Sequence, residues 1–98
     1  RVVRVDISTI RYIEGMSEYL KVHIMDQRPL IVLLSMKKME EHLPSHFLRI
    51  HRSYIVNMRQ VQEVTKNRVV MDKDTYLPVG DIYKESLSKY LEDKYLGR

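Results

Sequence analysis

The polar side chains best suited to binding or catalysis lie in the run from Phe47 to Asn57. His51, Arg52 and Ser53 stand between two apolar flanks that are typical of strands, so a sheet would present them at a strand junction. An arginine fork can reach guanine or a narrow minor groove, a serine hydroxyl can bind phosphate, and an asparagine can pair with adenine. The same residues also suit a turn in which Ser53 and Asn57 bond local backbone groups and His51 is a partnered core histidine. Residue chemistry alone leaves both interpretations open.

Metal ligation has little support in the sequence. His42 and His46 are four residues apart, a spacing that places two ligands on one helical face, but Pro44 between them interrupts that face. The chain contains no cysteine, which excludes thiolate ligands, disulfides and a cysteine nucleophile. We therefore predict no metal site and no cofactor.

Catalysis has equally little support. His51 and Ser53, with Asp72 or Asp81, supply the residue types of a hydrolase triad, but no nucleophile-elbow glycines surround the serine. The three glycines, Gly15, Gly80 and Gly97, are isolated from one another, so no phosphate-binding glycine loop is present. The sequence predicts no catalytic residues and a protein that is not an enzyme.

Length and charge narrow the class of protein. The 98 residues fit a single domain spanning 1–98, and 44% hydrophobic with 31% charged residues is typical of a globular chain. The net charge is +4, from 17 Lys and Arg against 13 Asp and Glu, and the isoelectric point is about 9.4. This excess favours a polyanionic partner, although a solvated basic surface without a partner accounts for it as well.

The remaining composition bears on location and context. The absence of cysteine fits a reducing cytoplasm. The longest apolar run, 30–34, is far below the roughly 20 residues that span a bilayer, so we predict no membrane association. The chain starts at Arg1-Val2-Val3 without an initiator methionine, from which we expect a domain excised from a longer protein whose regulatory domain is absent.

The first half of the chain alternates between apolar and polar residues, as half-buried strands do. We predict strands at 2–7, 10–14 and 19–25 and a buried strand at 30–34, forming an antiparallel meander. Ser35 then has the chemistry of a helix N-cap, and the periodic apolar residues after it stop at Pro44, which predicts a helix of about two turns.

The second half contains short segments rich in β-branched and aromatic residues. The predicted strands are 47–50, 54–56, 61–65, 68–71 and 75–79, with hairpin turns at 66–67 and 72–74. Tyr83, Leu87, Tyr90 and Leu91 trace one face of a C-terminal helix. The predicted fold is therefore mainly β, with a short middle helix and a C-terminal helix.

The 47–57 run resembles the signature of LytTR (LytR/AlgR-type) DNA-binding domains, and its neighbours match in order. The segment 10–14 is similar to the family's second strand, 39–44 to its short helix and following proline, and 76–79 with Tyr83 to its closing strand and helix start. The resemblance covers nearly all of residues 1–95. It implies an elongated stack of small antiparallel sheets that contacts DNA with loops instead of a recognition helix.

The resemblance implies three loop regions, of which two enter successive major grooves and one the minor groove between them. The first contains Met16, Ser17 and Glu18, the middle one His51, Arg52 and Ser53, and the third Gly80, Asp81 and Lys84. Gly80 departs from the family, whose members often have a polar or basic residue there, and Glu18 and Asp81 have the wrong sign for phosphate. Asp81 is better explained as an N-cap, and Lys84 as a phosphate ligand. The residues expected to contact DNA are Met16, Ser17, Glu18, Arg49, His51, Arg52, Ser53, Asn57, Gly80, Asp81 and Lys84.

Charge placement agrees with this expectation. A single acidic residue, Glu63, interrupts the basic stretch around and beyond the signature, which predicts a basic strip on the surface. The basic residues are Arg49, Arg52, Arg59, Lys66 and Arg68.

The resemblance implies a sequence-specific, double-stranded-DNA-binding output domain of a bacterial, cytoplasmic two-component response regulator. Its expected partners are promoter repeats, a second protomer on the DNA, and a sensor kinase that acts by phosphorelay through an absent receiver domain. The alternative is a protein-interaction module that docks a partner on exposed sheet edges and has no role with nucleic acid.

Overall fold

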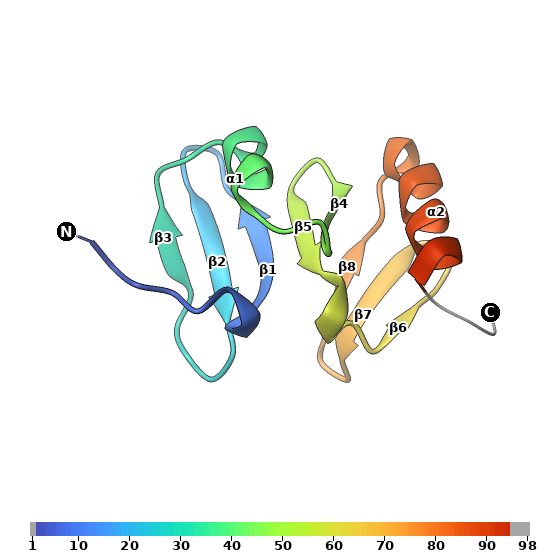
Figure 1. The fold of residues 1–98 in the computed structure, drawn as a ribbon, viewed down its shortest axis with the longest axis horizontal. Coiled ribbons are helices and arrows are strands. Elements are labelled where there is room, and N and C mark those ends of the chain that lie inside the picture. The colour runs from blue at the N-terminus through green and yellow to red at the C-terminus, as the bar shows by residue number, and fades with distance from the viewer. Residues whose placement is uncertain (1, 95–98) are drawn as a thin grey trace.

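The structure, a computed structural model, describes residues 2–94, and in this part of the chain eight strands form two antiparallel sheets (Figure 1). The molecule is elongated, with extents of 45 × 26 × 24 Å. The mainly β expectation, with a short middle helix and a C-terminal helix, is confirmed. In chain order the elements are η1 (Ile7–Thr9), β1 (Ile10–Gly15), β2 (Leu20–Ile24), β3 (Leu30–Val32), α1 (Met36–His42), β4 (Phe47–His51), β5 (Tyr54–Asn57), η2 (Met58–Gln60), β6 (Glu63–Val64), β7 (Arg68–Asp72), β8 (Thr75–Pro78), η3 (Asp81–Tyr83) and α2 (Lys84–Lys94).

The larger sheet has the strand order β3-β2-β1-β5-β4, and the smaller sheet has the order β6-β7-β8. The central strand β1 pairs with β2 on one side and with β5 on the other, and Ile13 lies opposite both Val22 and Ile55. The β4–β5 hairpin is thereby joined to the β1–β2 hairpin. This pairing fixes the ends of both hairpins relative to each other, so the loops at those ends are also held in fixed relative positions.

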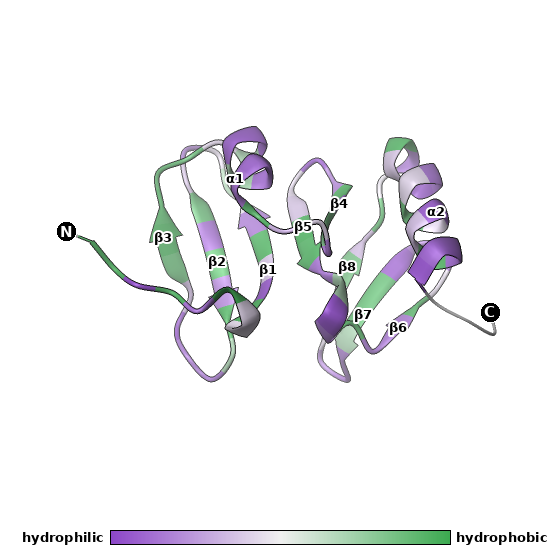
Figure 2. Ribbon diagram, in the orientation of Figure 1, coloured by the Kyte–Doolittle hydropathy of each residue, from purple (hydrophilic) through white to green (hydrophobic). Residues whose placement is uncertain are grey.

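Two hydrophobic cores cover the two faces of the larger sheet. Strand β5 contributes to both, because successive side chains of a strand point to opposite faces: Ile55 enters the first core and Val56 the second. Figure 2 shows the hydrophobic residues concentrated on the strands. The first core consists of Ile10, Ile13, Leu20, Val22, Ile24, Phe47 and Ile55, and the second of Ile50, Val56, Met58, Val69, Met71, Leu77, Val79 and Leu87.

Local signals predicted several elements correctly. The Ser35 side chain accepts a hydrogen bond from the Lys38 backbone N–H and begins α1, which ends at His42, two residues before Pro44. The two-residue connection at 66–67 is also present, closed by the Thr65 N–H to the Arg68 carbonyl. In each case the determinant lies within a few residues of the element, so the sequence contains it.

The predicted strand at 2–7 is wrong. The part from 2 to 6 has no regular secondary structure, and the Asp6 carboxylate accepts from the Ser8 N–H to begin the 3-10 turn η1. The alternating residues find no partner strand, and Val2 is almost fully exposed. An alternating pattern specifies a strand only where a neighbour is available to complete the hydrogen-bond ladder.

The predicted strand at 30–34 is shorter than expected and is not buried. Strand β3 covers only Leu30–Val32, at the outer edge of the larger sheet. Ile31 and Leu33 are 54% and 83% exposed. A continuous apolar run indicates burial on both faces only for an interior strand, and topology decides which strands are interior.

The two sheets are joined by an ion pair between the Arg11 guanidinium on β1 and the Asp72 carboxylate at the end of β7. The pKa of Asp72 is lowered, first by the hydrogen bond from the Asp74 N–H and then by Arg11. Because the folded pKa lies below the unfolded value, the stabilisation is fully present above the unfolded pKa and is lost as the pH falls through the folded pKa.

We therefore expect the free energy of unfolding of Asp72→Asn to fall less on acidification than that of the wild type, because the variant lacks the titrating carboxylate. Urea unfolding as a function of pH measures this, because the free energies of unfolding of variant and wild type should converge below the folded pKa of Asp72. Asp93→Asn, an exposed change on α2, is the matched control and should keep the wild-type pH profile. A constant difference between Asp72→Asn and wild type at every pH would contradict the linkage.

Candidate nucleic-acid interface

Three loop regions that are far apart in the sequence lie along one edge of the molecule, which we call the loop edge: 16–18, 51–53 and 80–84. Two backbone hydrogen bonds join them. The Gly15 N–H donates to the Ser53 carbonyl at 2.7 Å, and the Gly80 N–H donates to the Ile50 carbonyl at 2.8 Å. In Figure 1 the β1–β2 loop, the β4–β5 turn and the connection from β8 to α2 all lie at the upper edge of the view. The structure thus brings the three predicted regions together.

The approach is tight at Gly80, whereas a Cβ atom at Gly15 would make only ordinary contacts. A Cβ atom at Gly15 would lie 3.4 Å from the Met36 side chain and 3.6 Å from the Ser53 Cα atom. A Cβ atom at Gly80 would lie 3.2 Å from the Tyr83 ring and 3.6 Å from His51 Cδ2. Gly80 therefore contributes through its backbone and its lack of a side chain, which gives a physical reason for its departure from the polar residue expected there.

His51 has a defined hydrogen-bonding role within the middle turn. Its Nδ1 accepts from the Ser53 backbone N–H at 3.0 Å, so Nδ1 carries no proton in this arrangement and Nε2 is the N–H donor of the ring. The ring also packs against Tyr54, with centroids 5.5 Å apart. The ring is thus fixed in orientation with its one donor on Nε2.

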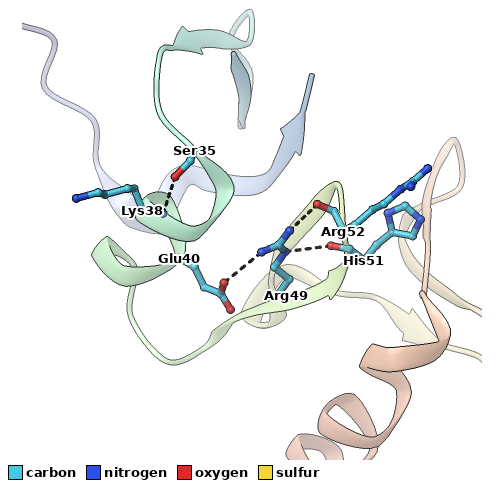
Figure 3. A network of polar contacts seen from close by, with 6 residues as sticks. All are labelled: Ser35, Lys38, Glu40, Arg49, His51 and Arg52. Atoms are coloured by element: carbon cyan, nitrogen blue, oxygen red, sulfur yellow. Dashed lines mark hydrogen bonds and ion pairs between the residues drawn. The ribbon is translucent and has the colours of Figure 1, made fainter. Parts of the chain in front are cut away.

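The Arg49 side chain holds the backbone of the middle turn through hydrogen bonds to its carbonyl groups (Figure 3). Its Nη2 donates to the Arg52 carbonyl at 2.7 Å, its Nε donates to the His51 carbonyl at 3.3 Å, and its Nη1 lies 3.5 Å from the Glu40 carboxylate on α1. The guanidinium carbon also lies 5.8 Å from the centre of the Tyr83 ring. Because these contacts direct the guanidinium into the protein, the geometry gives Arg49 a positioning role and does not support its predicted contact with DNA.

Arg52 is arranged in the opposite way. Its backbone carbonyl is held by Arg49, while its side chain is exposed and extends away from the Arg49 network in Figure 3. Ser53 beside it is partly buried, and its backbone serves the turn through the bonds to Gly15 and His51. The middle turn therefore presents one free guanidinium on a backbone that is fixed at both ends.

The third region differs from expectation at Asp81 and Lys84. The predicted N-cap role of Asp81 is wrong: Gly80 occupies the N-cap position of η3, with no side-chain cap bond, and the Asp81 side chain is 94% exposed. Lys84 Nζ lies 3.1 Å from Asp81 Oδ1 and 2.9 Å from Asn67 Oδ1. The ammonium charge is thus partly neutralised within the chain.

Asn57 lies outside the interface, and its predicted contact with DNA is wrong. The side chain is buried at 2% exposure, with Nδ2 donating to the Ile10 carbonyl at 2.9 Å and Oδ1 accepting from the Arg59 N–H at 3.0 Å. Both polar ends are therefore satisfied inside the protein. The alternative that Asn57 bonds local backbone groups holds for Oδ1, whereas Nδ2 bonds a carbonyl on a segment distant in sequence.

The predicted basic strip is divided between two parts of the molecule. Arg59 lies beyond β5, at the strand end opposite the middle turn, where its positive charge adds to burial in lowering the pKa of His46. Lys66 and Arg68 flank Asn67, whose carbonyl accepts from the Val79 N–H just before the third region. Arg52 and Arg59 are separated because strand β5 lies between them in the chain and leads away from the middle turn.

Sequence reasoning missed the residues that position the interface. Glu40 holds Arg49, Tyr83 packs beneath Arg49 and against Gly80, and Asn67 holds Lys84. Each of these contacts joins side chains on different elements, and no local pattern marks them. The sequence identified Asn67 only as a turn residue. That prediction is correct for its backbone but did not include the contact of its side chain with Lys84.

Other classes of site are not evident in residues 2–94. No three side chains of the types that hold metals gather there, and the His42 Nδ1 lies 2.7 Å from the Lys38 carbonyl of its own helix. No helix in this part of the chain has the length and apolar character needed to cross a membrane.

Comparison with known proteins agrees with this geometry. The family model described as the LytTr DNA-binding domain matches residues 1–92. Among solved structures, the chain is similar to a LytTr DNA-binding domain from a Bacillus cereus protein described as a methyl-accepting/DNA response regulator, with a TM-score of 0.80, 25% identity, and coverage of 91% of this chain and 86% of that one. No curated protein matches in sequence. The resemblance noted from the 47–57 run is confirmed, and the chain belongs to the LytTr DNA-binding domain family.

Proposed function

We propose that this domain binds duplex DNA sequence-specifically through the loop edge, as the output domain of a transcriptional response regulator. The observation that carries the proposal is the pair of backbone bonds, Gly15 to Ser53 and Gly80 to Ile50, that holds three loop regions on one edge. Loops on a rigid scaffold are where binding residues commonly lie. Membership in the LytTr family supports the same function.

Within this proposal the residues divide into readers and positioning residues. Arg52 offers a free planar fork for guanine or for a narrow minor groove, and His51 Nε2 offers a directed donor. Met16, Ser17 and Glu18 are exposed at the other end of the loop edge. Arg49 holds the middle turn, so its contribution to binding is indirect.

The size of the domain fits two neighbouring major grooves. Major grooves on one face of B-DNA recur about every 34 Å, and the 45 Å long axis of the molecule exceeds that distance. A minor groove lies between them, opposite the middle of such an elongated edge. We propose that two protomers bind repeated half-sites and that a receiver domain, phosphorylated by a sensor kinase, controls this assembly in the bacterial cytoplasm.

A protein-interaction module is the second candidate, and the β3 edge favours it. Ile31 and Leu33 are exposed at the outer strand of the larger sheet, where an added strand of another protein would find unpaired backbone groups. We propose no catalytic role. The loop edge offers binding groups for DNA, and His51 Nδ1 already accepts the Ser53 backbone N–H.

A salt titration distinguishes the two candidates. If three to five phosphates are neutralised, the logarithm of the binding constant should fall against the logarithm of salt concentration with a slope of about −2.7 to −4.5. Fluorescence anisotropy with a duplex selected from a random pool measures the slope. A slope near zero, or failure to retain any duplex, would contradict the DNA-binding proposal and favour the β3 edge.

A further inference from the structure

The third region of the loop edge presents an exposed apolar side chain. Ile82, the middle residue of η3, is 84% exposed. Tyr83 turns inward, against Gly80 and beneath Arg49, while Asp81 is exposed like Ile82. The short turn therefore directs Asp81 and Ile82 outward together, on a backbone anchored by the Gly80 N–H.

Single exposed apolar residues are common on protein surfaces, so exposure alone has no functional meaning. The position of Ile82 is what matters. It lies two residues after Gly80, whose N–H is bonded to β4 next to the middle turn, and two residues before Lys84. The positive charge of Lys84 is partly neutralised by Asp81 and Asn67. The positive charge nearest to Ile82 along the chain, that of Lys84, is therefore already partnered, and the exposed apolar side chain of Ile82 itself suits a base edge better than a phosphate.

The apolar group that base edges offer in the major groove is the C5-methyl of thymine. We propose that Ile82 is a specificity-determining residue that packs against a thymine methyl in the groove entered by the third region. This inference rests on the proposed DNA-binding function and adds to it a base preference at one end of the site. Asp81 beside it contributes a carboxylate, which accepts from cytosine N4 and disfavours a phosphate.

The test removes the thymine methyl group from the DNA and, separately, the Ile82 side chain from the protein. A duplex selected from a random pool is resynthesised with uracil in place of thymine at one position at a time, and Kd is measured for the 98-residue chain. At one position near the end of the half-site, uracil should weaken binding about fourfold, the value of one buried methyl-sized group. Ile82→Ala should bind the thymine duplex more weakly and should no longer distinguish thymine from uracil at that position.

Ile7→Ala is the matched control. Ile7 is also an exposed isoleucine, 41% accessible, and it lies in η1 before the start of β1, whereas the loop edge lies beyond the end of β1. This variant should keep the wild-type Kd and the wild-type response to uracil. A thermal melt checks that each variant is folded.

The outcomes separate this inference from the proposed function. Wild-type binding that is unchanged by uracil at every position overturns the role of Ile82 and leaves DNA binding intact. A methyl effect that persists in full in Ile82→Ala also overturns it, because another residue then contacts the methyl. If the wild-type chain retains no duplex from the pool, both proposals fail.

Discussion

Replacing Arg52 with alanine should weaken binding to the selected duplex by about 1–3 kcal/mol, or roughly 5- to 150-fold, and should weaken binding to random duplex much less. The Arg52 side chain is exposed and extends away from the Arg49 network, while its carbonyl is fixed by Arg49. The guanidinium is thus free to meet a base edge, and its backbone has little freedom left to lose. Preference at one position of the site should relax.

Two matched variants test whether this effect is specific to Arg52. Arg59→Ala removes the same charge at the opposite end of β5 and should change neither affinity. Lys84→Ala should weaken selected and random duplexes equally and only slightly, because Lys84 Nζ is already held by Asp81 and Asn67. The measurements are Kd values on selected and scrambled duplexes across a salt range. Equal losses on both duplexes for Arg52→Ala would make Arg52 a backbone contact and move specificity to the outer loops.

Ile55→Ala should lower the free energy of unfolding by about 2–5 kcal/mol. Ile55 is fully buried in the first core, on the strand that lies between β1 and β4 and that leads out of the middle turn. Truncation leaves a cavity that the paired strands on both sides cannot readily close. Such a loss is a large part of the total stability of a domain of this size.

Ile31→Ala is the control for that prediction, because Ile31 is the same residue type on the exposed edge strand β3. We expect a change within about 0.5 kcal/mol, as for other surface substitutions. Urea unfolding followed by circular dichroism measures both variants. Equal losses for the two variants would contradict the assignment of the first core around Ile55.

The elements set by local chemistry were predictable. Ser35 and Pro44 delimit α1, the alternating segment at 10–14 became β1, and the segment at 47–50, predicted from its β-branched and aromatic residues, became β4. The errors at 2–7 and 30–34 share one cause, since neighbouring strands decide both whether an alternating segment pairs at all and whether a strand is buried. The hydrogen-bond partner of a side chain was similarly ambiguous. The Asn57 amide could pair with adenine, but its Nδ2 donates to the Ile10 carbonyl instead.

By itself, the sequence determined the fold class, the family and the middle turn, because alternation, capping and an ordered set of motifs are properties of short stretches of chain. Only the tertiary structure decided which polar groups remain free. Arg49 and Arg52 are three residues apart, yet one guanidinium is bound to backbone carbonyls and the other is exposed. Besides these local carbonyls, Arg49 contacts Glu40 and Tyr83, which lie on other elements and approach Arg49 only after the strands have paired. Hydrogen bonds and ion pairs act over a few ångströms in space, so distance along the chain does not reveal which donors they use.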